Sequence, residues 1–212
     1  VQNATLLNAT VLPGTAGEGP TISGRNTFDG VTLAAPTVLN GNARLMIEND
    51  LVLNATLTAA SGTRIEFQPG DSGDQLLTGS GTVIVNGGGG STRSFLRPVG
   101  ETTLTIDSGI TIRGGSASIG GAAGTQTIIN RGTLIADRVG VGSGEDLRVD
   151  AENFINEGEL EATGPGTLRI AGDWSNAGII RDNGAIVQLA VTFSFADLGT
   201  LDRQGGEIEI VG

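Results

Sequence analysis

The sequence predicts an all-β fold, a parallel β-solenoid of about nine coils with protruding loops. Two observations predict it. A short motif recurs at intervals of 26 and then 20 residues, and the segments between its copies alternate apolar and polar residues with a period of two, as strands do. The composition agrees, because 36 glycines among 212 residues supply turns and 38% apolar residues supply a core.

The repeat is clearest in the second half of the chain. Its three copies are "IINRGTLIAD" from Ile128, "FINEGELEAT" from Phe154 and "WSNAGIIRDN" from Trp174, each followed by a further alternating segment that begins near Asp146, Gly166 and Gly184, with a fourth such segment from Gly205. One coil could not bury its apolar side by itself, so we expect coils to stack. Stacking predicts two inward columns, which are Ile128, Phe154 and Trp174, and Leu134, Leu160 and Ile180.

Each copy contains Asn-x-Gly. Asn and Gly both tolerate the left-handed backbone of a tight corner, and Asn side chains bond to turns and to one another. We therefore predict an internal Asn ladder of Asn130, Asn156 and Asn176, with turn glycines of positive φ at Gly132, Gly158 and Gly178. Three unrelated surface turns are the alternative, which the shared apolar residue two places before each Asn disfavours. The same register places Arg131 beside Glu157, and Arg148 beside Arg169.

The first half of the chain follows the same pattern more loosely. Alternating runs occupy residues 30–34, 43–48, 50–59, 63–68, 81–86, 102–114 and 126–132, and protruding loops are expected at 13–20, 68–75 and 86–100. No linker divides the chain. We predict that residues 1–212 form a single β-solenoid domain, a segment of a longer repetitive polypeptide, which ends in a strand with no helical cap.

The composition excludes several classes of chemistry. The chain contains no Cys, His, Lys or Tyr, so thiol and imidazole catalysis, Schiff bases and disulfides are all excluded. Only carboxylates and arginines remain for catalysis. The net charge of −11 argues against a nucleic-acid partner, and no apolar run approaches the roughly 20 residues of a membrane-spanning helix.

The apolar-x-Asn-x-Gly-x-apolar coils resemble the right-handed β-helices of bacterial exported adhesins, the filamentous-haemagglutinin and autotransporter-like repeats. The similarity lies in "FINEGELEATGPGTLRIAGDWSNAGII" and "IINRGTLIAD", and it covers Thr102 to Gly212 well and the first hundred residues loosely. The resemblance implies a right-handed solenoid that is secreted or held at the cell surface, as a stalk or adhesive module.

An enzyme is the principal alternative. Polysaccharide lyases and glycosidases also use right-handed β-helices, and a glycosidase needs two carboxylates about 5 to 9 Å apart. The candidate cluster comprises Glu145, Asp146, Asp150, Glu152, Glu157, Glu159 and Glu161. Outward acids on alternating strands are ordinarily a solvated face, so we expect no catalytic residues and no cofactor. A bound Ca²⁺ at this cluster or at residues 71–75 stays an alternative.

These observations favour a non-enzymatic extracellular element with a structural or adhesive role. The expected partners are a surface glycan or a receptor on a host or neighbouring cell. Open strand edges at the ends of a solenoid also allow the chain to join itself head to tail as a homopolymer, that is, as a filament subunit.

Overall fold

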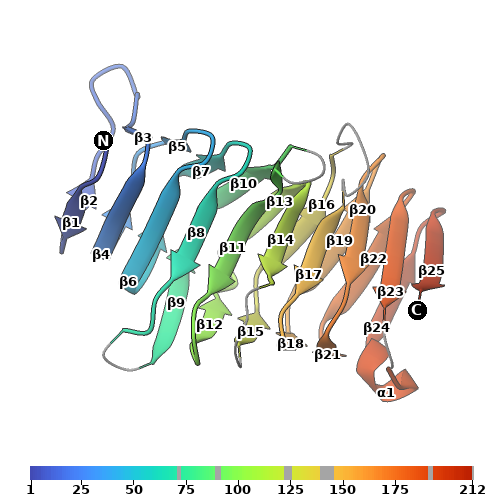
Figure 1. The fold of residues 1–212 in the computed structure, drawn as a ribbon. Coiled ribbons are helices and arrows are strands. Elements are labelled where there is room, and N and C mark those ends of the chain that lie inside the picture. The colour runs from blue at the N-terminus through green and yellow to red at the C-terminus, as the bar shows by residue number, and fades with distance from the viewer. Residues whose placement is uncertain (71–72, 89–91, 122–125, 139–145, 191–192, 212) are drawn as a thin grey trace.

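A computed structural model describes residues 1–70, 73–88, 92–121, 126–138, 146–190 and 193–211. The chain winds into coils that follow one another from the N-terminus to the C-terminus (Figure 1). All strand pairs in the described ranges are parallel, and one sheet takes nine successive strands in chain order. The predicted parallel β-solenoid of about nine coils is therefore confirmed.

Each regular coil contributes a strand to each of three faces. Face 1 consists of β8 (Arg64–Phe67), β11 (Ser94–Pro98), β14 (Ala117–Gly120), β17 (Leu147–Asp150), β20 (Thr167–Ile170), β23 (Ile186–Ala190) and β25 (Glu207–Val211). Face 2 consists of β9 (Asp74–Gly79), β12 (Thr103–Ile106), β15 (Thr127–Asn130), β18 (Asn153–Asn156) and β21 (Asp173–Asn176). Face 3 consists of β3 (Thr21–Ile22), β5 (Thr37–Leu39), β7 (Thr56–Ala59), β10 (Thr82–Asn86), β13 (Thr111–Gly115), β16 (Thr133–Ala136), β19 (Glu159–Thr163), β22 (Ile179–Asn183) and β24 (Thr200–Arg203).

Faces 1 and 2 belong to one sheet of 16 strands. Two long strands, β4 (Arg25–Leu33) and β6 (Arg44–Leu53), run through both faces, and the short strands β1 (Thr5–Leu7) and β2 (Thr10–Val11) pair with β4. A register shift between Asp29 and Val31 marks the bend, where Gly30 has a φ of 59°. In later coils the chain turns a full corner at this place, so that face 1 and face 2 have separate strands, such as β8 and β9.

The core is formed by columns of apolar side chains that repeat from coil to coil. Ile128, Phe154 and Trp174 are partners in adjacent strands of face 2, and all three are buried. Leu134, Leu160 and Ile180 form the corresponding buried column of face 3. The second column extends upstream through Ile112, Val83 and Leu57. Period-two alternation thus places one side of most strands inside, whereas consecutive residues of β8 and β14 are buried.

The three repeat glycines are needed for a different reason from the predicted one. Gly132, Gly158 and Gly178 do not have positive φ, so the conformational part of the prediction is wrong. A Cβ at Gly158 would lie 2.2 Å from the Gly132 carbonyl oxygen, and one at Gly178 would lie 2.0 Å from the Gly158 carbonyl oxygen. The corner backbones of successive coils therefore touch, and only glycine leaves room for this approach.

Two further expectations need correction. Residues 94–98 lie within a predicted loop, yet they form β11, whose Leu96 is buried in the core. The chain does end in a strand, β25, as expected, but a short helix, α1 (Phe195–Leu198), precedes it and lies against β21 at the end of face 2 (Figure 1). Glycine-rich flanks concealed the first element, and four residues are too few to show a helical period.

Candidate functional site

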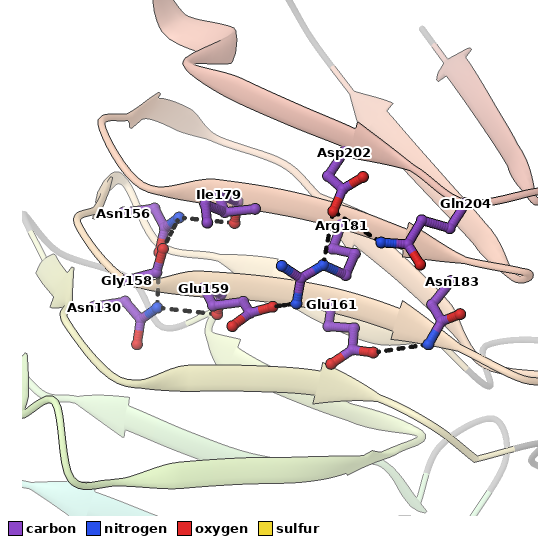
Figure 2. A network of polar contacts seen from close by, with 10 residues as sticks. All are labelled: Asn130, Asn156, Gly158, Glu159, Glu161, Ile179, Arg181, Asn183, Asp202 and Gln204. Carbon is purple, nitrogen blue, oxygen red and sulfur yellow. Dashed lines mark hydrogen bonds and ion pairs between the residues drawn. The ribbon is translucent and has the colours of Figure 1, made fainter.

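The corner between faces 2 and 3 carries the predicted asparagines, and the structure brings all three together. Asn130 Nδ2 donates to Asn156 Oδ1 at 2.7 Å (Figure 2). Asn156 Nδ2 donates in turn to Asn176 Oδ1 at 2.6 Å. The same Nδ2 atoms lie 3.2 Å from the carbonyl oxygens of Gly132 and Gly158. The side chains are buried and bond to one another and to their own turns, so they hold the corners in register.

The ladder has two different ends. At its upstream end Asn130 pairs with Ile106, an apolar residue, and Asn130 Oδ1 is buried without a hydrogen-bond partner among the described residues. At its downstream end Asn176 Nδ2 donates to the carbonyl oxygen of Leu198, the last residue of α1, at 2.6 Å. The helix therefore takes the place of the next rung. Apart from Asn130 Oδ1, the side-chain oxygen and nitrogen atoms of the ladder all make structural hydrogen bonds.

Charged side chains on the outside of the same coils are paired across rungs. Arg131 Nε lies 2.8 Å from Glu157 Oε2, as their shared repeat position suggests, and this hydrogen bond raises the pKa of the Arg131 guanidinium. Arg148 and Arg169 are also register partners, and Asp146 and Asp150 lie 3.6 and 3.9 Å from the Arg148 guanidinium. These carboxylates reduce the like-charge repulsion.

Arg181 is the centre of a network on face 3 (Figure 2). Its guanidinium contacts Glu159 on the preceding coil and Asp202 on the following coil, with 3.0 Å between Arg181 Nε and Asp202 Oδ2. The hydrogen bond from Arg181, joined by one from Gln204, lowers the pKa of Asp202. The hydrogen bond to Asp202, and then the charge of Glu159, raise the pKa of Arg181. The network connects three coils.

The acidic cluster is not brought together into one groove. Asp146 directly precedes β17 and Asp150 ends it, both at face 1, whereas Glu159 and Glu161 lie on face 3. Asp146 forms an ion pair of 2.6 Å with Arg93, while Glu161 accepts a hydrogen bond from Asn183. Glu152 and Glu157 lie at the corners between the faces, and Glu145 lies outside the described residues. The carboxylates are thus spread around the coil.

A different pair of carboxylates shares a hollow on face 2. Asp50, Asp74 and Arg131 line a shallow hollow of about 270 Å³, together with Gln75, Leu76 and Thr105. Asp50 has a φ of 71°, and its Oδ1 accepts the Leu76 backbone N–H at 2.7 Å. Asp50 therefore has a local structural role. This pair could not be predicted from the sequence, because the two residues are 24 positions apart and come together only through the stacking of β6 and β9.

Among the described residues, no group of three or more Asp, Glu, His or Cys side chains is arranged to hold a metal ion. Of the 71–75 segment considered for Ca²⁺, residues 71 and 72 lie outside the described ranges. The helix of the described chain is not long and apolar enough to cross a bilayer.

Sequence reasoning missed two outward features. Thr56, Thr82, Thr111 and Thr133 are register partners along face 3 and form one column. On face 1, Glu66 is buried at 1% exposure between Arg44 and Arg97. The partners in the threonine column, and the ion-pair partners of Glu66, lie 22 to 31 positions apart in the sequence. Neither feature is therefore visible as a local pattern.

Comparison with known proteins identifies no relative. No family model, no curated protein and no solved structure matches the chain. The fold is thus established by the stacked strands alone.

Proposed function

We propose that this chain is a non-enzymatic structural or adhesive β-solenoid that acts outside the cell, as part of a stalk, an adhesin or a filament. The extracellular location rests on the resemblance of its Asn-x-Gly coils to those of bacterial exported adhesins. An open stack of parallel coils is also a suitable scaffold for this role, because it presents long, regular outer faces.

The observation that carries the proposal is the placement of the acidic residues. A carbohydrate-active enzyme needs two carboxylates that face each other in a groove, one of them with a raised pKa. Asp146, Asp150, Glu159 and Glu161 are instead distributed over two faces, and most contact arginines or amides. Of the carboxyl groups with a marked pKa shift, Asp197 and Asp202, both are shifted downward.

A glycan array combined with a product assay tests the proposal. The purified chain should bind immobilised surface glycans or cells and should release no reducing ends or unsaturated sugars from a panel of polysaccharides. Turnover of any polysaccharide would overturn the non-enzymatic part of the proposal. A chain that binds no glycan, no cell and no second copy of itself would overturn the adhesive part.

The enzyme alternative is supported by one observation, the hollow that Asp50 and Asp74 share on face 2. If turnover is detected, Asp50→Asn and Asp74→Asn should each abolish it. Asp173→Asn, at an exposed position on the same face, is the matched control. Activity that survives both substitutions would place the chemistry elsewhere.

A further inference from the structure

Face 1 carries six of the twelve arginines of an otherwise acidic chain, which are Arg25, Arg44, Arg64, Arg97, Arg148 and Arg169. We infer that the upstream part of this face, the Arg25–Arg44–Arg64 column, binds an acidic polysaccharide laid along the stacking direction. The inference rests on the proposed adhesive function and names the class of its partner.

The column is set by strand register. Arg25 pairs with Arg44, and Arg44 pairs with Arg64, on the adjacent strands β4, β6 and β8. Neighbouring rungs of a sheet are about 4.8 Å apart, so three cationic side chains emerge in a row over about 10 Å. Like charges directly opposite one another destabilise a sheet. Such a row is therefore costly unless anions compensate it.

The protein itself compensates only part of this charge. Glu66, which is buried, forms ion pairs with Arg44 and with Arg97, the latter at 2.8 Å. Arg25 and Arg64 are exposed, and neither makes an ion pair or a side-chain hydrogen bond within the described ranges. The nearest other acids on this face, Asp29 and Glu48, lie four residues further along β4 and β6. Two guanidinium groups thus remain available to an external anion.

The spacing and surroundings of these two groups indicate the kind of anion. Arg25 and Arg64 are two rungs apart, about 10 Å, a length comparable to one disaccharide unit. Guanidinium groups bind carboxylate and sulfate in a planar, bidentate manner. Phe95 continues the column on the next rung and is only partly buried, with the Arg97 guanidinium 5.2 Å from its ring centre. The face therefore combines cations with apolar surface, as a chain of sugar rings requires.

Nucleic acid is the other polymeric anion to consider. A phosphate backbone carries a denser charge, and its affinity comes from many cationic contacts. The chain has a net charge of −11, and Asp29 and Glu48 border the column, so a dense polyanion is repelled at a short distance. A polysaccharide with a carboxylate on every second sugar fits this limited cationic row better.

The test is a titration of the full chain with hyaluronan oligosaccharides, which carry a carboxylate on every second sugar, at low and at physiological salt. Neutral dextran oligosaccharides and single-stranded oligothymidine are the parallel probes. The double variant Arg25→Gln/Arg64→Gln removes the two free cations. The double variant Arg113→Gln/Arg203→Gln removes the same charge from face 3, and is the matched control.

Hyaluronan should bind with an affinity that decreases with salt, and the face 1 variant should weaken binding by about tenfold, the loss of two exposed ion pairs. The control variant should bind within about twofold of the wild type. Absence of hyaluronan binding, equal binding of dextran, tighter binding of oligothymidine, or equal losses in both variants would each overturn the inference. If the wild-type chain binds other glycans or cells but not hyaluronan, the inference fails while the adhesive function stands.

Discussion

At the scale of single residues, the Asn ladder shows how one side chain serves three coils. Asn156 accepts from Asn130, donates to Asn176 and lies within hydrogen-bond distance of the Gly158 carbonyl oxygen, all in a buried corner. Its loss would remove one hydrogen bond from each of the two neighbouring amides. Asn130, at the upstream end of the ladder, differs from Asn156, because its Oδ1 has no hydrogen-bond partner and its register partner is Ile106.

We therefore predict that Asn156→Ala lowers the free energy of unfolding by about 3 kcal/mol, because it removes the hydrogen bonds to both neighbouring asparagines and to the Gly158 carbonyl oxygen in a buried corner. Asn130→Ala should cost about 1 kcal/mol, since it also removes an unsatisfied oxygen. Urea unfolding followed by circular dichroism measures both. Equal losses at the two positions would contradict a connected ladder.

The repeat glycines give a second prediction, which separates close approach from backbone conformation. Gly158→Ala should lower the free energy of unfolding by about 3 kcal/mol, because its Cβ would meet the Gly132 carbonyl oxygen. Gly164 has a φ of 59° and open space around its Cα, so Gly164→Ala should cost only about 1 kcal/mol of backbone strain. The same urea experiment measures both, and a larger loss for Gly164→Ala than for Gly158→Ala would contradict close approach as the reason for glycine at the repeat position.

At the scale of elements, α1 and the residues before it close one end of face 2. Phe193 packs on Trp174 with 5.3 Å between the ring centres, and Trp174 is only 7% exposed. Leu198 closes the Asn ladder from the same segment. The segment thus covers both an apolar and a polar column of the last full coil.

Trp174 is the single tryptophan of the chain, so its fluorescence reports on this cover. Phe193→Ala should shift the emission to longer wavelength and increase quenching by acrylamide, because water reaches the indole. Phe195, 94% exposed on α1, provides the control, and Phe195→Ala should leave the spectrum unchanged. An unchanged spectrum in Phe193→Ala would mean that this segment does not cover the coil.

The contact between β22 and β24 predicts a dependence on pH. Hydrogen bonds from Arg181 and Gln204 lower the folded pKa of Asp202 below its unfolded value. The stability that Asp202 contributes is therefore present above the unfolded pKa of about 3.9 and is lost as the pH falls through the folded pKa. The sign is the usual one for a paired carboxylate.

Thermal unfolding of the wild type and Asp202→Asn should differ near neutral pH and converge in acid. The difference should be modest, because the pair is exposed to solvent. Asp173→Asn removes an exposed carboxylate without such partners and should follow the wild type at every pH. A difference between wild type and Asp202→Asn that persists below the folded pKa would contradict the role of this ion pair.

At the scale of the whole molecule, the sequence predicts the solenoid because aligning the copies of the repeat also gives the register in which their strands pair. Asn130, Asn156 and Asn176 share one position, and parallel stacking then places their neighbours. Features that join different positions of distant coils could not be predicted in this way. The Asp50–Asp74 hollow, the buried Glu66 and the Arg25–Arg44–Arg64 column depend on the pairing of irregular upstream coils, whose lengths vary.

Distances along one outward column of face 3 test the stacking most directly. Register links Thr56 to Glu159, Ile179 and Thr200 through four, five and six rungs. The chain has no cysteine, so spin labels on cysteine pairs that join position 56 to each of the other three are site-specific. Electron–electron double resonance should give narrow distances near about 19, 24 and 29 Å, a linear rise of 4.8 Å per rung. Broad distributions, or distances that do not increase with rung number, would contradict coils stacked in a single register.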